Sequence, residues 1–458
     1  MLTPLFLLTL VSLTMGYVYK MPLVRVEPQR IQMMREGKWA MALKQMNAER
    51  LMRKASAGAV YNQSVLLETG TADFWVPDAS CAPPPRIKGC DESECDAGAT
   101  CKIFCPKVEL CCGGPGGMLA ERKYTCTGKN VYDPTKSATY VKMEGSWLFE
   151  YNNGFVQGLY ANDTVRFGTE GEHRLTVPGT GFGRAVRISK YLMNRSSLFT
   201  TWHKNHQKND YFSCPFEDYL RKIVNYFIAV HYNLICVLGP SGIYSRFDGV
   251  LGLGFTSLAL TETIQPFVRA HRLGLVEPIF TVHMRQVGVA DNVYGGAFTW
   301  GGIDTENCGN LIAYQEVSLV WFWQFRLRNV SVGSYVSNTG WDVALDTASA
   351  FIGAPHSVVK GVAKALDAEY SPEEDAYFVD CDGYPKLQFG IGENIYTVKG
   401  DNFKLTLEEY KCILPIYAMD SVFLGPSWIF GAPFMRQYCT IFDMKMFRIG
   451  FANSLQEE

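Results

Sequence analysis

Two acidic residues in matching contexts are the first candidates for chemistry in this 458-residue chain. Glu68 ends the apolar run 65–67 and is followed by Thr-Gly, whereas Asp346 ends the apolar run 343–345 and is followed by Thr-Ala. Each pattern predicts a strand, a tight turn that carries a carboxyl group, and a further strand. The two acids are 278 positions apart, so the rest of the chain has to serve as a scaffold that brings the two turns together.

Two carboxyl groups held close together do not ionise independently. Because neighbouring negative charges repel, the pair shares one proton, and its titration belongs to the pair and not to either residue. Such a pair offers one carboxylate that can accept a proton and one carboxylic acid that can donate one. The alternative interpretation is two unrelated surface turns, and the order of the other motifs argues against it.

A second repeated element supports an internal duplication. Val250-Leu251-Gly252 follows the first acid turn, and Ile429-Phe430-Gly431 follows the second. Each half of the chain therefore has an acid turn followed later by an apolar-apolar-Gly element. The composition, with 47% hydrophobic residues, 42 glycines and many aromatic residues, favours a β-rich globular protein with two sizeable cores.

Other enzyme classes find little support in the sequence. We find no Gly-x-Ser-x-Gly element near a His/Asp set, no His-Glu-x-x-His and no phosphate-binding Gly-x-x-x-x-Gly-Lys-Ser/Thr. His203 and His206 lack an ordered framework for a metal, and an acidic body argues against nucleic-acid binding. No metal or cofactor is therefore expected.

Cysteine usage points to an oxidising compartment. Of 14 cysteines, eight crowd into the segment 81–126 without paired Cys-x-x-Cys units or interleaved histidines, which favours disulfides over zinc. Their pairing stays open. Residues 1–16 are an uncharged apolar stretch, which predicts a secretory signal peptide, with an N-terminal anchor as the alternative. No later run is long and apolar enough to predict a membrane span.

The segment 17–60 differs in charge from the rest of the chain. It carries nine Lys and Arg against three Glu, whereas residues 61–458 have a net charge of −8. Residues 17–24 alternate like a strand that tolerates Pro22 at an edge, and 27–54 shows a helical pattern. A basic segment before an acidic body suggests an electrostatic clamp within the molecule, although an ordinary basic helix is the simpler interpretation.

At this point the sequence resembles the pepsin-like aspartic proteases, peptidase family A1, and most closely the secreted nematode members. Glu68-Thr69-Gly70-Thr71 and Asp346-Thr347-Ala348-Ser349 occupy the two acid-Thr-Gly positions of that family. The segments 247–253 and 425–438 look like its two apolar-apolar-Gly regions. The resemblance covers most of 17–458 except about 190–245.

The resemblance implies an all-β, bilobal pepsin-like fold with a central cleft and few short helices. Its implied domains are the signal peptide 1–16, a propeptide-like segment 17–60, an N-terminal lobe 61–312 and a C-terminal lobe 313–458. The N-terminal lobe holds the cystine-rich loop 81–126 and an atypical insert at 190–245.

The resemblance also implies roles for individual residues. Glu68 and Asp346 are the implied catalytic pair, and Cys381 and Cys412 an implied disulfide, with Cys308 and Cys439 as plausible partners. The implied substrate-binding residues are Tyr151 of a hairpin flap, Trp75 beside it, Gly70, Thr71, Ala348 and Ser349. The implied activity is endopeptidase cleavage of protein or peptide substrates at acidic pH. The implied protein is a secreted or lysosomal monomer. It is expected to have no cofactor, no nucleic-acid partner and no membrane span.

Both acid turns depart from the family pattern. Glu68 stands where an Asp is expected and extends the carboxyl group by roughly 1.3–1.5 Å. Ala348 replaces a Gly, and its Cβ crowds the pair, with added strain if its φ is positive. Compared with the family, the sequence lacks a first strand before Val65 and has an additional segment at 190–245. This suggests an altered splice pattern or a faulty gene model. The alternative is a genuine lineage-specific loop.

Three interpretations follow. The first is an acid endopeptidase, intact or weak; the second is a non-catalytic relative that binds peptides or inhibitors without cutting them; the third is a mispredicted form of an active protease gene.

Overall fold

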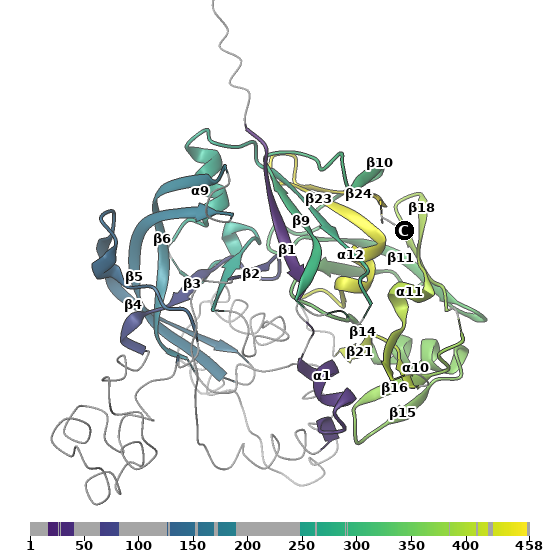
Figure 1. The fold of residues 1–458 in the computed structure, drawn as a ribbon. Coiled ribbons are helices and arrows are strands. Elements are labelled where there is room, and N and C mark those ends of the chain that lie inside the picture. The colour runs from purple at the N-terminus through teal and green to yellow at the C-terminus, as the bar shows by residue number, and fades with distance from the viewer. Residues whose placement is uncertain are drawn as a thin grey trace, which may run out of the picture.

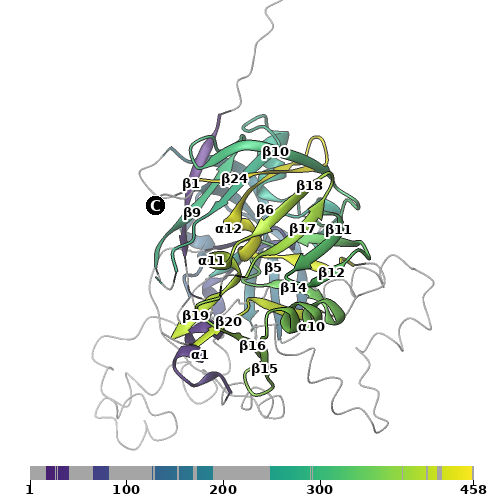
Figure 2. The same cartoon turned by 90° about the vertical axis from the view of Figure 1, so that its right-hand side faces the viewer.

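The computed structural model is strand-rich and built from four sheets (Figures 1 and 2). It describes residues 17–40 without 26 and 28, 65–81, 126, 129–151, 154–168, 173–188, 248–288 without 262, 290, 292–383, 385–408, 411–419 and 425–455. The predicted signal peptide, the insert 190–245 and most of the cystine-rich loop lie outside these residues. Among the helices described, none is both long and apolar enough to cross a bilayer.

One lobe is a six-stranded sheet that contains the first acid turn. Its strands, in spatial order, are β2 (Val65–Glu68), β7 (Gly249–Gly252), β3 (Phe74–Pro77), β6 (Leu175–Ile188), β5 (Gly154–Phe167) and β4 (Val141–Tyr151). The predicted hairpin is confirmed, because β4 and β5 pair as far as Tyr151 and Gly154.

The other lobe contains the second acid turn. Its eight-stranded sheet comprises β18 (Asn394–Val398), β17 (Leu387–Ile391), β11 (Gln324–Val332), β13 (Trp341–Leu345), β22 (Trp428–Phe430), β14 (Ile352–Pro355) and β21 (Ile416–Met419), with β12 (Tyr335–Ser337) paired to β11. A four-stranded sheet is formed by β15 (Glu369–Ser371), β16 (Ala376–Val379), β20 (Lys411–Ile413) and β19 (Leu405–Glu408).

A third large sheet joins distant parts of the chain. Its order is β1 (Tyr19–Arg25), β9 (Val293–Trp300), β8 (Ile279–Met284), β23 (Tyr438–Asp443), β24 (Arg448–Ser454) and β10 (Cys308–Glu316). Figure 1 shows β1, in purple, beside β9 and near the yellow C-terminal strands. Together the sheets confirm the predicted bilobal, β-rich fold class.

Within the described residues the helices are few and short, as predicted. They are α1 (Gln29–Arg35), α9 (Pro266–Arg272), α10 (His356–Ala365), α11 (Gly400–Phe403) and α12 (Ala432–Gln437), with single 3₁₀ turns at η1 (Ala79–Cys81), η3 (Pro134–Lys136) and η4 (Thr256–Leu258). In α10 the buried residues Val358, Val359, Val362 and Ala363 form one apolar stripe, which is the pattern that packs a helix onto a core.

The N-terminal strand and the first part of the helical pattern after it are confirmed. β1 pairs on one side with β9, where Pro22 lies opposite Ala297, so the missing N–H of Pro22 sits on an edge strand. The helical pattern predicted over 27–54 is confirmed in α1 and is interrupted at Gly37, and residues 41–54 lie outside the described part of the chain. Gly37 has a φ of +63°, the left-handed conformation that commonly ends helices, and α1 stops at Arg35.

The glycines of the apolar-apolar-Gly elements are required by close backbone approach. A Cβ at Gly252 would lie 2.5 Å from the backbone C of Ala72, and one at Gly431 would lie 2.3 Å from the backbone O of Ser349. Each Gly therefore lets its strand pack against the opposite side of the acid turn in its own lobe. This is the structural reason for the duplication seen in the sequence.

A pair of glycine variants tests this packing. We expect Gly252→Ala to lower the free energy of unfolding by on the order of 1–3 kcal/mol, because backbone atoms must shift to admit the methyl group. Gly309→Ala is the matched control, since its Cβ would meet only ordinary contacts at 3.5 Å or more. Denaturant titration of both variants measures the difference, and equal midpoints would contradict the packing role of Gly252.

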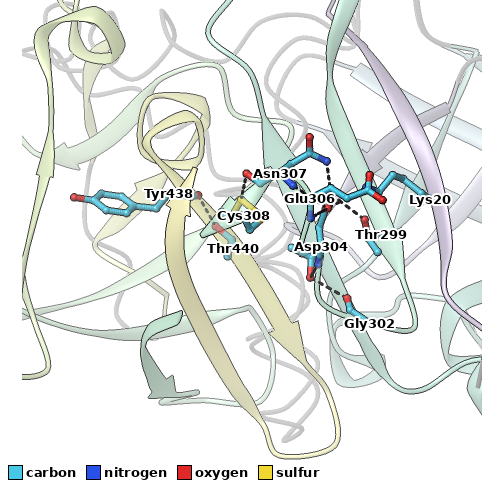
Figure 3. The surroundings of a disulfide bond; sticks show 11 residues. Lys20, Thr299, Gly302, Asp304, Glu306, Asn307, Cys308, Tyr438 and Thr440 are labelled. Atoms are coloured by element: carbon cyan, nitrogen blue, oxygen red, sulfur yellow. Dashed lines mark hydrogen bonds and ion pairs between the residues drawn. A yellow bond between two sulfur atoms is a disulfide. The ribbon is translucent and has the colours of Figure 1, made fainter. Parts of the chain in front are cut away.

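Three disulfides lie within the described residues. They join Cys81 to Cys126, Cys308 to Cys439 and Cys381 to Cys412. The last two are the pairs that the family resemblance implied. Cys81–Cys126 closes the base of the cystine-rich loop, and Cys308–Cys439 ties the start of β10 to β23 (Figure 3).

Candidate active site

The two acid turns occupy equivalent positions in the two lobes. β2 runs parallel to β7, with Glu68 opposite Gly252, and β13 runs parallel to β22, with Leu345 opposite Phe430. Glu68 therefore ends β2, an edge strand of its sheet, and Asp346 directly follows β13, an inner strand of its sheet. Both acids are buried, with exposed fractions of 0% and 4%.

A reciprocal pair of threonines holds the turns together. The N–H of Thr69 donates to Oγ1 of Thr347, and the N–H of Thr347 donates to Oγ1 of Thr69, each at 3.1 Å. Each hydroxyl in turn donates across the lobes, Thr69 to the carbonyl of Leu345 at 2.9 Å and Thr347 to that of Leu67 at 2.6 Å. Four hydrogen bonds thus fix the two acid-bearing turns against each other.

Thr69 and Thr347 are functional residues that were not predicted from the sequence. The signal was present, because each acid is followed directly by Thr in otherwise different surroundings. A hydroxyl can both donate and accept, which is what a reciprocal arrangement related by approximate twofold symmetry requires. Neither turn alone shows this role.

Asp346 has a defined environment on its own turn. Its Oδ1 accepts the backbone N–H of Ala348 at 2.9 Å. From the other turn, a Cβ on Gly70 would lie 3.3 Å from both Cγ and Oδ1 of Asp346, so the absence of a side chain there makes room for the carboxyl group. Gly70 thus serves the pair by its small size.

Glu68 has a contrasting environment. Both of its carboxyl oxygens are buried and accept no hydrogen bond within the described part of the chain. Burial, and next the nearby charge of Asp346, raise the pKa of Glu68 well above its ordinary value. Glu68 therefore stays protonated under conditions in which an exposed glutamate is ionised.

The structure places the remaining predicted site residues on the two acid turns, in β3 and at the end of β4. The hydroxyl of Thr71 accepts the N–H of Asp73 at 3.4 Å, and that of Ser349 donates to the carbonyl of Phe351 at 3.2 Å, so both stabilise their own turns. Trp75 is buried in β3, with its ring centroid 6.5 Å from that of Trp147. Tyr151 ends β4, and its side chain lies outside the described atoms.

Ala348 does not add the backbone strain considered from the sequence. The non-glycine residues with positive φ in the described chain are Asn292, Asp367, Asp375 and Phe447, so Ala348 is in an ordinary conformation. Steric crowding of the pair by its methyl group stays a prediction.

No group of three or more His, Cys, Asp and Glu side chains within the described residues could hold a metal ion. The site thus presents one buried neutral acid and one carboxyl group that accepts a backbone N–H, fixed by four hydrogen bonds between two lobes. In this arrangement the carboxyl group of Asp346 can accept a proton and the neighbouring carboxyl group of Glu68 can donate one.

The sequence of the chain was compared with those of known protein families. The model of the eukaryotic aspartyl proteases matches residues 58–197 and 237–454. The chain belongs to the eukaryotic aspartyl proteases. The match leaves out 198–236, which falls inside the insert predicted from the sequence at 190–245.

Individual aspartyl proteases align along most of the chain. It is 32% identical to aspartic protease 2 of Necator americanus, with 98% of each chain covered. It is 33% identical to aspartic protease 6 of Caenorhabditis elegans over 86% of this chain and 78% of that protein. A cathepsin D of Chionodraco hamatus is 23% identical over 85% of this chain and 77% of the relative.

The raised pKa of Glu68 predicts a pH-dependent effect on stability. A carboxyl group whose pKa is raised on folding stabilises the fold fully below its unfolded pKa, and this contribution is lost as pH rises through the folded pKa. Glu68→Gln keeps the neutral form at every pH. We therefore expect it to raise the midpoint of thermal unfolding near neutral pH by on the order of a few degrees, and to leave it unchanged in acid.

Thermal unfolding at several pH values measures this effect. Glu144→Gln is the matched control, because the side chain of Glu144 is 91% exposed. The control should follow the wild type at all pH values. A Glu68→Gln variant that is destabilised equally in acid and at neutral pH would contradict a protonated Glu68.

Proposed function

We propose that this chain is an acid endopeptidase that hydrolyses peptide bonds of protein substrates, with Asp346 as the base and Glu68 as the acid. One observation carries the assignment of roles. Asp346 accepts a backbone N–H from Ala348, which favours its charged form, whereas the buried oxygens of Glu68 accept no hydrogen bond in the described structure, which favours its neutral form.

The reaction uses these two states directly. The Asp346 carboxylate takes a proton from a water molecule as the water oxygen bonds to the peptide carbonyl carbon. Glu68 gives its proton to the carbonyl oxygen, which completes a neutral tetrahedral intermediate. In the second half, Asp346 returns its proton to the amide nitrogen, the C–N bond breaks, and Glu68 recovers a proton as the new carboxyl group forms.

The fixed roles have a consequence for the pH profile. The active form needs a protonated Glu68 and an ionised Asp346, so kcat/KM falls once pH exceeds the pKa of Glu68. Since burial raises that pKa, the alkaline limb of the profile should extend toward neutral pH.

The rate is expected to be modest. The additional methylene of Glu68 displaces its carboxyl group, and the approximate twofold relation between the turns directs the Ala348 methyl toward Glu68, as Gly70 lies beside Asp346. A misplacement of about 1 Å can cost about 10²-fold in rate. The same features favour the alternative function, a cleft that binds peptides or inhibitors without cleaving them.

The proposal includes the surroundings of the pair. Tyr151, at the end of β4, is assigned to the flap, with Trp75 behind it, and Gly70, Thr71, Ala348 and Ser349 border the substrate. We assign 17–60 to a propeptide-like segment. Disulfides support an oxidising route and hence a secreted or lysosomal location, for a monomer that acts on proteins.

The direct test uses the purified full chain. It is acidified and incubated with haemoglobin as the protein substrate, with and without a statine-type inhibitor. Hydrolysis that the inhibitor blocks supports the proposal. Inhibitor binding without hydrolysis above the level of the Asp346→Asn variant identifies the non-catalytic alternative instead.

A further inference from the structure

The turn between β23 and β24 carries a bulky side chain in a strained conformation. Phe447 has a φ of +50°, in the left-handed region that is an outlier for a bulky residue. The other non-glycine residues with positive φ in the described chain are Asn292, Asp367 and Asp375, whose short polar side chains tolerate this conformation better. Backbone strain costs stability, and it is concentrated at places where ligands bind. The conformation of Phe447 therefore needs an explanation.

The rest of the turn holds Phe447 in place. The carboxylate of Asp443 accepts the N–H of Met446 at 3.0 Å, which closes the turn. The carbonyl of Phe447 accepts the N–H of Val317 at 2.9 Å. The ring of Phe447 lies 5.9 Å, centroid to centroid, from that of Phe255. The turn is thus fixed on both sides, and it presents the ring in a defined position.

Phe447 belongs to an exposed apolar surface that two separate segments form. In the turn, Met446 is 53% and Phe447 48% exposed, and in the segment after β10 Leu319 and Val320 are each 39% exposed. The hydrogen bond from Val317 to Phe447 ties the two segments together. We call these four exposed residues the apolar patch. Exposed apolar side chains that gather in one place mark interaction sites, whereas single ones do not.

A buried apolar cluster joins the patch to the acid turns. Trp321, the next residue along the chain from the patch, packs against this cluster. Its members are Ala72, Leu258, Phe322, Ala344, Met419 and Ile429. Ala72 lies four residues after Glu68, and Ala344 lies two residues before Asp346. Apolar side chains therefore form a continuous series from the candidate active site to the surface.

We propose that the apolar patch is a second binding site for protein substrates, which holds an apolar stretch of the same polypeptide whose peptide bond lies at the acid pair. Its ligand is an unfolded segment with aliphatic or aromatic side chains. This inference rests on the proposed function, because it deepens the assignment of protein substrates to the acid pair. A substrate that follows the apolar series outward reaches the patch, where the ring of Phe447 loses contact with water.

Three considerations favour a polypeptide over other occupants of the patch. A substrate already held at the acid pair reaches the patch at a high effective concentration, so a few apolar contacts suffice. Four exposed side chains are few beside the roughly 20–30 residues that each partner contributes to a stable protein interface, which argues against a second copy of the chain. The turn 444–447 carries one cation, Lys445, whereas anionic membranes attract clusters of several.

Binding of haemoglobin to the full chain with Asp346→Asn tests the patch without requiring turnover. Acid-unfolded haemoglobin should bind Phe447→Asn in this background about tenfold more weakly than its parent, because the ring no longer covers apolar substrate. Asn tolerates the left-handed conformation, so the midpoint of thermal unfolding should stay the same or rise. Ile395→Asn is the matched control. It removes another exposed apolar side chain, 70% exposed in β18, and should bind like its parent.

Equal haemoglobin affinity of Phe447→Asn and its parent would overturn the proposal. A fall in the thermal midpoint that accompanies weaker binding would overturn it too, because Phe447 would then have a structural role. Met446→Ser is a second test that leaves the residue with positive φ in place, and it should weaken binding severalfold.

The other occupants have their own readouts. Suppose that Phe447→Asn abolishes binding of the chain to phosphatidylserine vesicles, or its self-association, and leaves haemoglobin binding unchanged. The patch would then serve a lipid surface or a second copy of the chain, and the proposal would be wrong. Hydrolysis enters none of these measurements, so an inactive acid pair would leave them unaffected.

Discussion

Replacement of Asp346 by Asn is expected to lower kcat/KM for a protein substrate by about 10²–10⁴-fold, the usual contribution of a positioned general base. The amide keeps the size of the side chain and can still accept the N–H of Ala348, which holds Oδ1 at 2.9 Å. It cannot take a proton from water. The loss should therefore appear in kcat, with the stability of the protein largely retained.

Asp342→Asn is the matched control for this variant. Asp342 lies in β13, the strand that leads to Asp346, and pairs on the surface with Arg326 at 2.8 Å. Because an exposed ion pair contributes little, the control should keep both activity and stability. Full activity in Asp346→Asn would show that any hydrolysis in the preparation does not come from this site.

The second large effect is a gain. We expect the double variant Glu68→Asp with Ala348→Gly to raise kcat/KM by about 10²-fold, because it withdraws the carboxyl group by one methylene and removes the methyl group that crowds it. Steady-state kinetics at acidic pH on the two single variants and the double variant measure the gain. The two residues share one site, so the double variant should exceed the product of the single effects.

The absence of any gain in the double variant would be equally informative. It would place the defect outside the pair, either in the strand that is predicted to be missing before Val65 or in the predicted insert at 190–245. Full activity of the wild type, equal to that of the double variant, would show instead that the longer Glu68 is accommodated without loss.

The positions of the two acids and the fold class could be predicted from the sequence, for a local reason. An apolar run followed by an acidic residue and a tight turn predicts the end of a strand from neighbouring residues alone. Glu68 is the last residue of β2, and Asp346 directly follows β13. The edge position of β1 followed from Pro22 in the same local way. Local signals of this kind survive folding because they depend on neighbouring residues.

Other features depended on contacts between distant segments. The bonds between Thr69 and Thr347 span 278 positions, and the lack of donors at Glu68 is a property of everything packed around it. The interruption of the helical pattern at Gly37 was not predicted, because the spacing of apolar residues does not show where backbone conformation ends a helix.

The central claim is that Glu68 is the neutral acid of a pair with fixed roles, and infrared spectroscopy tests it most directly. The wild type near neutral pH should show the carbonyl stretch of a protonated carboxylic acid that is absent from Glu68→Gln and unchanged in Glu144→Gln. This band should be lost only at the pH at which kcat/KM declines. A wild-type spectrum that lacks this band near neutral pH would show that Glu68 is ionised, and would contradict the account.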